Sequence, residues 1–120
     1  MRLVALRGAI TCTEDTKSEI DANTKRLVSE MLARNEIAHE DLVSVIFTAT
    51  DDLRSEFPAA AARAVGLGDI PLLCARELNV EGSMPRCIRV LVHCYTGRDR
   101  TELHHVYLED ARSLRDDLPE

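Results

Sequence analysis

A β-strand is predicted most clearly for Cys87-Ile88-Arg89-Val90-Leu91-Val92-His93-Cys94-Tyr95-Thr96. Side chains alternate across a strand, so Ile88, Val90, Val92 and Cys94 share one face of it. The opposite face carries Arg89 among apolar neighbours. A guanidinium in such a setting needs an acidic partner, which would be either Glu77 or the carboxylate of a ligand.

The other predicted elements lie on both sides of this run and give the order β-α-β-α-β-β-β. Further strands are predicted at 3–10, 42–50, 71–77 and 104–108, helices at 16–35 and 58–66, and a helical turn at 110–114. Thr16 and Glu19 are expected to form a capping box, and Asn35 to end the first helix. Residues 42–50 are apolar on both faces, which predicts a strand covered on both sides. This order predicts a single α+β domain over residues 1–120, with a mixed sheet and its helices on one face.

Composition excludes several classes of protein. A formal net charge of −6 and four aromatic residues offer neither a field for a polyanion nor a stacking platform, so nucleic acid is not an expected partner. No apolar run approaches the roughly 20 residues that span a bilayer, and no secretory signal is visible. Four cysteines without a CxxC pair favour free thiols in the cytoplasm over disulfides or a zinc site.

Familiar catalytic motifs are missing, since the chain has no phosphate-binding glycine loop, GxSxG or HExxH. Cys74 has no identifiable partner that would stabilise a thiolate, so it is expected to be a packed or hydrogen-bonding thiol. What remains is a set of charged residues, most of which would ordinarily be solvated surface groups. They are Arg7, Arg63, Glu77, Arg89 and Arg115.

Several strings, taken together, resemble the AroH-class chorismate mutases. They are Arg7-Gly8-Ala9, Phe47-Thr48-Ala49-Thr50-Asp51-Asp52-Leu53, Phe57-Pro58-Ala59-Ala60-Ala61-Ala62-Arg63, Cys87-Ile88-Arg89-Val90, His105-Val106-Tyr107-Leu108 and Leu114-Arg115. Each string is weakly specific, but they follow in order at near-constant spacing from residue 3 to about residue 118. The resemblance departs from the family at Ala60, where a lysine is frequent, at Leu73 and at Asp116.

This resemblance implies a homotrimer, a pseudo-α/β-barrel similar in architecture to the RidA-type trimers, with active sites between subunits. The implied reaction is the Claisen rearrangement of chorismate to prephenate in phenylalanine and tyrosine biosynthesis, without metal or cofactor. Arg89 would contact the ether oxygen and a carboxylate, Arg7 a carboxylate, and Glu77 and Cys74 the ring hydroxyl. Tyr107 would lie on the enolpyruvyl carboxylate side. Walls would come from Phe57, Ala59, Val80 and Leu114, and charges at the mouth from Arg63 and Arg115.

Two other functions remain open at this stage. A non-catalytic trimeric module could use the same arginines to bind a small anion. An imine deaminase of the RidA type would also place an arginine between subunits, but the strings above do not match that family.

Overall fold

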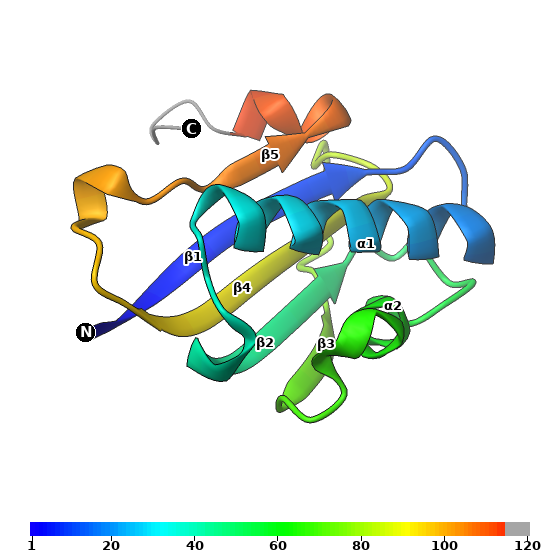
Figure 1. Cartoon of the computed structure of the whole chain (residues 1–120). Coiled ribbons are helices and arrows are strands. Elements are labelled where there is room, and N and C mark those ends of the chain that lie inside the picture. Colours follow the sequence, from blue (N-terminus) through cyan, green and yellow to red (C-terminus); the bar gives the residue numbers. More distant parts are fainter. Residues whose placement is uncertain (115–120) are drawn as a thin grey trace.

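A five-stranded mixed β-sheet forms the centre of the computed structural model, which describes residues 1–114 (Figure 1). Its strands are β1 (Arg2–Thr11), β2 (Leu42–Ala49), β3 (Leu72–Arg76), β4 (Cys87–Thr96) and β5 (Val106–Leu108). They lie in the order β3-β2-β4-β1-β5. The central β4 pairs antiparallel with β1 and β2, while the outer β3 and β5 pair parallel with their neighbours. The predicted mixed sheet is confirmed, and the strand bounds differ from the prediction by one or two residues.

Two α-helices, α1 (Lys17–Arg34) and α2 (Pro58–Ala62), lie on the same face of the sheet (Figure 1). Short helical turns complete the described chain: η1 (His39–Asp41), η2 (Arg63–Leu67), η3 (Arg100–Glu102) and η4 (Glu109–Leu114). Pro58 occupies the first turn of α2, where its missing N–H costs no hydrogen bond. Within residues 1–114, no helix is both long and apolar enough to cross a membrane.

Half of the capping box predicted for α1 is wrong. Thr16 caps the helix as expected, because its Oγ1 accepts the Glu19 N–H at 3.2 Å, and Asn35 ends it. The Glu19 carboxylate, however, does not turn back to Thr16. It accepts the backbone N–H groups of Thr13 and Glu14 and the Thr13 hydroxyl, so the loop that enters the helix offers it three donors in place of one.

The hydrophobic core fills the space between this pair of helices and the sheet. The face of β4 predicted to be apolar is buried there, with Ile88 and Cys94 fully enclosed. At Gly8 the first helix approaches β1 so closely that a Cβ would come within 2.5 Å of Met31 Sδ. Glycine at this position therefore sets the distance between α1 and the strand that carries Arg7.

The other face of the sheet, which we call the open face, is largely uncovered. Arg89, Leu91 and His93 are only half-buried there, and Leu3 of β1 is 54% exposed. The prediction that residues 42–50 are covered on both sides is wrong for the single chain, because Ser44, Ile46 and Thr48 also remain partly exposed on this face. At one end η4 covers it, and a second cluster forms from Ala9, Cys87, Tyr107 and Ala111.

Candidate active site

One pocket on the open face gathers the residues expected to be catalytic. It has a volume of about 280 Å³. Arg7, Glu77, Arg89 and Tyr107 line it together with Gly8, Ala9, Ile46, Thr48, Val90 and Leu91. These residues come from four strands and from the position that follows β3, so the sheet as a whole assembles the pocket.

Arg89 and Glu77 form an ion pair within this pocket. Arg89 lies opposite Ala9 on one side and Thr48 on the other, at the middle of the sheet. Its Nε lies 3.4 Å from Glu77 Oε2. The contact does not have the geometry of a hydrogen bond, and this buried Nε–H has no hydrogen-bond partner within the described chain. The negative charge of Glu77 compensates this donor in part, and the Arg89 side chain is 43% exposed and lines the pocket, so its other N–H groups are available to a ligand oxygen.

Thr48 was not predicted as a site residue, yet it orients the acid of this pair. Its hydroxyl donates to Glu77 Oε2 at 2.5 Å. The signal that could have found it is the alternation of Ser44, Ile46 and Thr48 along β2, which places Thr48 on the same face as Arg89.

Arg7 lies at the rim of the pocket with its side chain exposed. Its backbone N–H donates to His105 Nδ1 at 2.9 Å. Burial lowers the pKa of His105 below the ordinary value of 6.5, and the positive charge of Arg7 lowers it further. The sequence singled out Arg7 but not the imidazole that contacts it.

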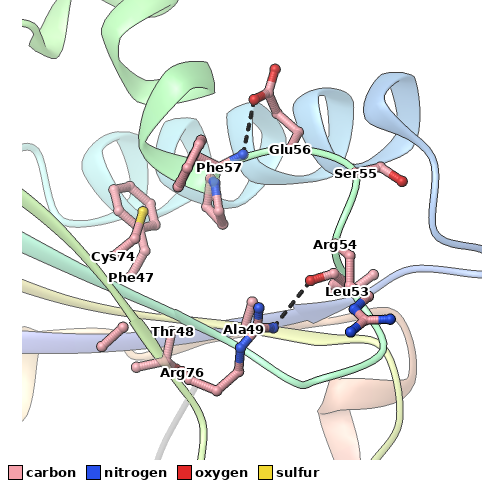
Figure 2. A pocket seen from close by; sticks show the side chains of 12 residues that line it. Phe47, Thr48, Ala49, Leu53, Arg54, Ser55, Glu56, Phe57, Cys74 and Arg76 are labelled. Atoms are coloured by element: carbon pink, nitrogen blue, oxygen red, sulfur yellow. Dashed lines mark hydrogen bonds between the residues drawn. The ribbon is translucent and has the colours of Figure 1, made fainter.

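Phe57 and Cys74 line a different pocket, of about 420 Å³, between the sheet and the segment that leads into α2. Figure 2 shows Phe57 on that segment and Cys74 on the neighbouring strand. Phe57 is 67% exposed, which is unusual for so large an apolar side chain. Arg76, which lines the same pocket, donates to the backbone oxygens of Thr50 and Leu53 and so holds one wall in place.

The remaining predicted residues within the described chain line neither of these two pockets. Ala59 is buried in α2, and Arg63 is exposed directly after that helix. Val80 is exposed in the loop after β3. Leu114 packs against the cluster that contains Tyr107, beside the first pocket. Arg115 lies outside the described residues.

The first pocket has the chemistry of an anion site. Two guanidiniums and a phenol can bind carboxylates, and the arginine oriented by Glu77 can stabilise negative charge that develops on an oxygen. Among residues 1–114, no three His, Cys, Asp or Glu side chains are grouped so as to hold a metal ion.

Comparison with known proteins identifies the family. The sequence model described as "Chorismate mutase type I" matches residues 3–118. The chain is 50% identical over 114 residues to a protein named chorismate mutase AroH from Thermus thermophilus, covering 94% of this chain and 93% of that protein. It is 38% identical over 119 residues to chorismate mutase AroH of Bacillus subtilis, covering 98% and 94%. The solved structure of a chorismate mutase from Clostridium thermocellum superposes with a TM-score of 0.90 at 43% identity, over 92% of this chain and 98% of that one. The chain therefore belongs to the type I chorismate mutase family.

Proposed function

We propose that this chain converts chorismate to prephenate in the biosynthesis of phenylalanine and tyrosine. Family membership supports the reaction, and relatives that the chain covers almost completely carry the enzyme's name. The observation that carries the proposal is the Arg89 guanidinium, whose Nε lies 3.4 Å from Glu77 and whose side chain, 43% exposed, lines an open pocket together with Arg7. A donor held in this way is suited to an oxygen that gains negative charge during a reaction.

The reaction makes unusual demands on a protein. It is a rearrangement of one substrate, in which no proton is transferred and no nucleophile attacks. The enzyme has to hold the flexible enolpyruvyl arm over the ring and to stabilise the charge that separates as the C–O bond breaks ahead of C–C bond formation. Neither task requires a general base or a reactive thiol.

The residues of the first pocket divide these two tasks. Arg7 and Tyr107 bind carboxylates of the substrate and so restrict its conformation. Arg89 contacts the ether oxygen, where a planar guanidinium can also reach a carboxylate. Because charge on that oxygen grows in the transition state, this contact accelerates the reaction and does more than bind the substrate. Glu77 orients Arg89, and its carboxylate accepts a hydrogen bond from the ring hydroxyl. Cys74, which lines the second pocket, would approach the same hydroxyl from a neighbouring subunit.

A second copy of the chain completes the site in this proposal. Phe57, Cys74 and Arg63 lie around the second pocket and α2, away from Arg7 and Arg89. One chain thus presents two partial sites, each with residues that the family resemblance assigns to substrate. The open face exposes Leu3 and Tyr95, and β3 exposes Leu73, which supports contact with other subunits. We propose a homotrimer in which each active site joins the first pocket of one subunit to the Phe57 region of the next. As the family resemblance implies, Leu114 would form part of its wall, and Arg63 and Arg115 would supply charge at its mouth.

A cytoplasmic location is part of the same proposal. It is supported by the four cysteines, all of which are unpaired.

The decisive experiment follows the ultraviolet absorbance of chorismate after the purified protein is added. An enzyme predicts a loss of absorbance far faster than in buffer, with prephenate as the product. A protein that binds chorismate without accelerating its disappearance would instead be an anion-binding module, and the proposed reaction would be wrong.

A further inference from the structure

The backbone N–H of Arg7 is hydrogen-bonded to the imidazole of His105, at a position where a longer β5 would supply a backbone carbonyl. On one side, β1 pairs with β4 along its whole length, from Arg2 to Thr11. On its other side β5 pairs only with residues 8 to 10. Arg7 lies one residue beyond this short ladder, and its N–H donates to His105 Nδ1 at 2.9 Å. The side chain of His105, which directly precedes β5, therefore supplies the hydrogen-bond acceptor that the short strand lacks at this position.

This hydrogen bond requires a neutral His105. An imidazole nitrogen accepts only when it carries a lone pair, so the proton of His105 must be on Nε2. When a second proton is added, both ring nitrogens become donors. The Nδ1–H then points at the Arg7 N–H, and the hydrogen bond between them is lost.

The surroundings of His105 oppose that second proton. Facing it are Arg7 from β1, His93 from β4 and Arg100 from η3, the last two around a pocket of about 390 Å³. No carboxylate lines this pocket among the described residues. Burial, and then the charge of Arg7, accordingly lower the pKa of His105 below 6.5. The unfolded chain thus takes up this proton more readily than the folded chain, so the histidine's effect on stability appears as a loss below about pH 6.5.

We propose that His105 is a positioning residue for Arg7, whose neutral imidazole fixes the arginine at the pocket and whose protonation releases it and weakens substrate binding. This inference rests on the proposed function, in which Arg7 binds a carboxylate of chorismate. The effect falls on KM, because Arg7 restrains the substrate while Arg89 acts on the breaking bond.

The reaction is well suited to the test. No proton moves in the rearrangement, and the carboxylates of the substrate ionise near pH 4. A change in KM between pH 8 and pH 5 must therefore come from the protein. Loss of one hydrogen bond of ordinary strength corresponds to about a fivefold rise in KM. Work at an ionic strength of about 0.15 M limits the general attraction between a more positive protein and an anionic substrate.

The experiment measures kcat and KM from pH 8 to pH 5 for the wild type, His105→Asn, His105→Ala and His93→Asn. The wild type should show KM rising about fivefold toward acid pH with little change in kcat. His105→Asn retains an acceptor that does not titrate, so its KM should stay near the wild-type value at pH 8 throughout. His105→Ala should have a raised KM at every pH. His93→Asn makes the same substitution in the same pocket at a ring whose Nδ1 contacts Ser44 Oγ and not the Arg7 N–H, and it should keep the wild-type pH profile.

Three results would overturn the inference. They are a wild-type KM that is flat or falls toward acid pH, a His105→Asn variant that keeps the pH dependence, and a His93→Asn variant that loses it. Wild-type protein inactive at pH 8 would overturn the proposed function itself. In that case the Arg7 amide, followed by NMR, still reports on the hydrogen bond, because its hydrogen exchange should quicken as His105 titrates in the wild type and not in His105→Asn.

Discussion

Glu77 joins Arg89 to the rest of the sheet. Its Oε2 accepts the Thr48 hydroxyl at 2.5 Å and lies 3.4 Å from Arg89 Nε. Its backbone N–H donates to the Ala49 oxygen at 3.0 Å, which fixes the residue at the end of β2. The carboxylate therefore has little freedom, and the guanidinium beside it is oriented before any substrate arrives.

Two substitutions at Glu77 should distinguish the contribution of its negative charge to activity from the contribution of its hydrogen-bond acceptor. Glu77→Gln retains an acceptor but loses the charge, so kcat/KM should fall about tenfold, whereas Glu77→Ala should cost about 100-fold. Steady-state kinetics with chorismate checks both values. Glu81→Gln, an exposed site in the loop after β3, is the matched control and should behave as wild type. Full activity in Glu77→Ala would remove this residue from the site.

Most of the pocket could be predicted at the level of single residues, and Glu77 was one of the two acidic partners expected for Arg89, but the sequence could not decide between them. The family strings and the alternation of β4 pointed to Arg7, Arg89 and Tyr107. Glu77 follows β3, and β2 lies between that strand and β4, so the contact with Arg89 depends on the strand order. Local patterns do not encode strand order, and for the same reason His105 was quoted in a string without any role.

Periodicity was the reliable guide at the level of elements. The strict alternation of β4 and the helical spacing of α1 gave bounds close to those observed. The failures have physical reasons. Residues 42–50 look covered on both sides because their second face is partly apolar, yet nothing within the single chain covers it. The Glu19 carboxylate found better donors in the preceding loop than in its own cap.

Gly8 should be a sensitive point in the packing of α1 on β1. An alanine there would bring Cβ within 2.5 Å of Met31 Sδ and 3.2 Å of Leu27 Cδ1, both side chains being fully buried. Gly8→Ala should lower the free energy of unfolding by about 1–3 kcal/mol, as overpacked sites do. Urea unfolding measures this change. Gly97→Ala, where a Cβ meets nothing within 4 Å, is the control, and equal stability of the two variants would contradict the argument.

The described chain has two pockets and an open sheet face, and in the proposed function each pocket is one half of an active site. The first pocket holds both guanidiniums, while Phe57 is exposed at the second pocket and Arg63 just after α2. In a closed symmetric assembly, the first pocket of each subunit would lie against the second pocket of the next subunit. This arrangement explains why a chain with the family's residues leaves its substrate pocket open.

Mixed assemblies test that arrangement directly. Arg89→Ala disables the first partial site, and Phe57→Ala combined with Arg63→Ala disables the second. When the two variants are refolded together, random assembly should restore about a quarter of the wild-type rate, because that share of sites combines two intact halves. The same variants mixed without refolding serve as the control. Activity that remains the average of the two variants after refolding would contradict a shared site, as would a stable active monomer in light scattering.

The account depends most on Arg89 acting on the bond that breaks. Its side chain is 43% exposed, so its ion pair with Glu77 adds little to stability. The most direct measurement is the turnover of chorismate by wild type and Arg89→Ala, made beside their urea unfolding. We predict a fall in kcat of at least about 100-fold, with the free energy of unfolding changed by less than about 1 kcal/mol. Undiminished turnover, or a loss of stability that matches the loss of activity, would contradict the account.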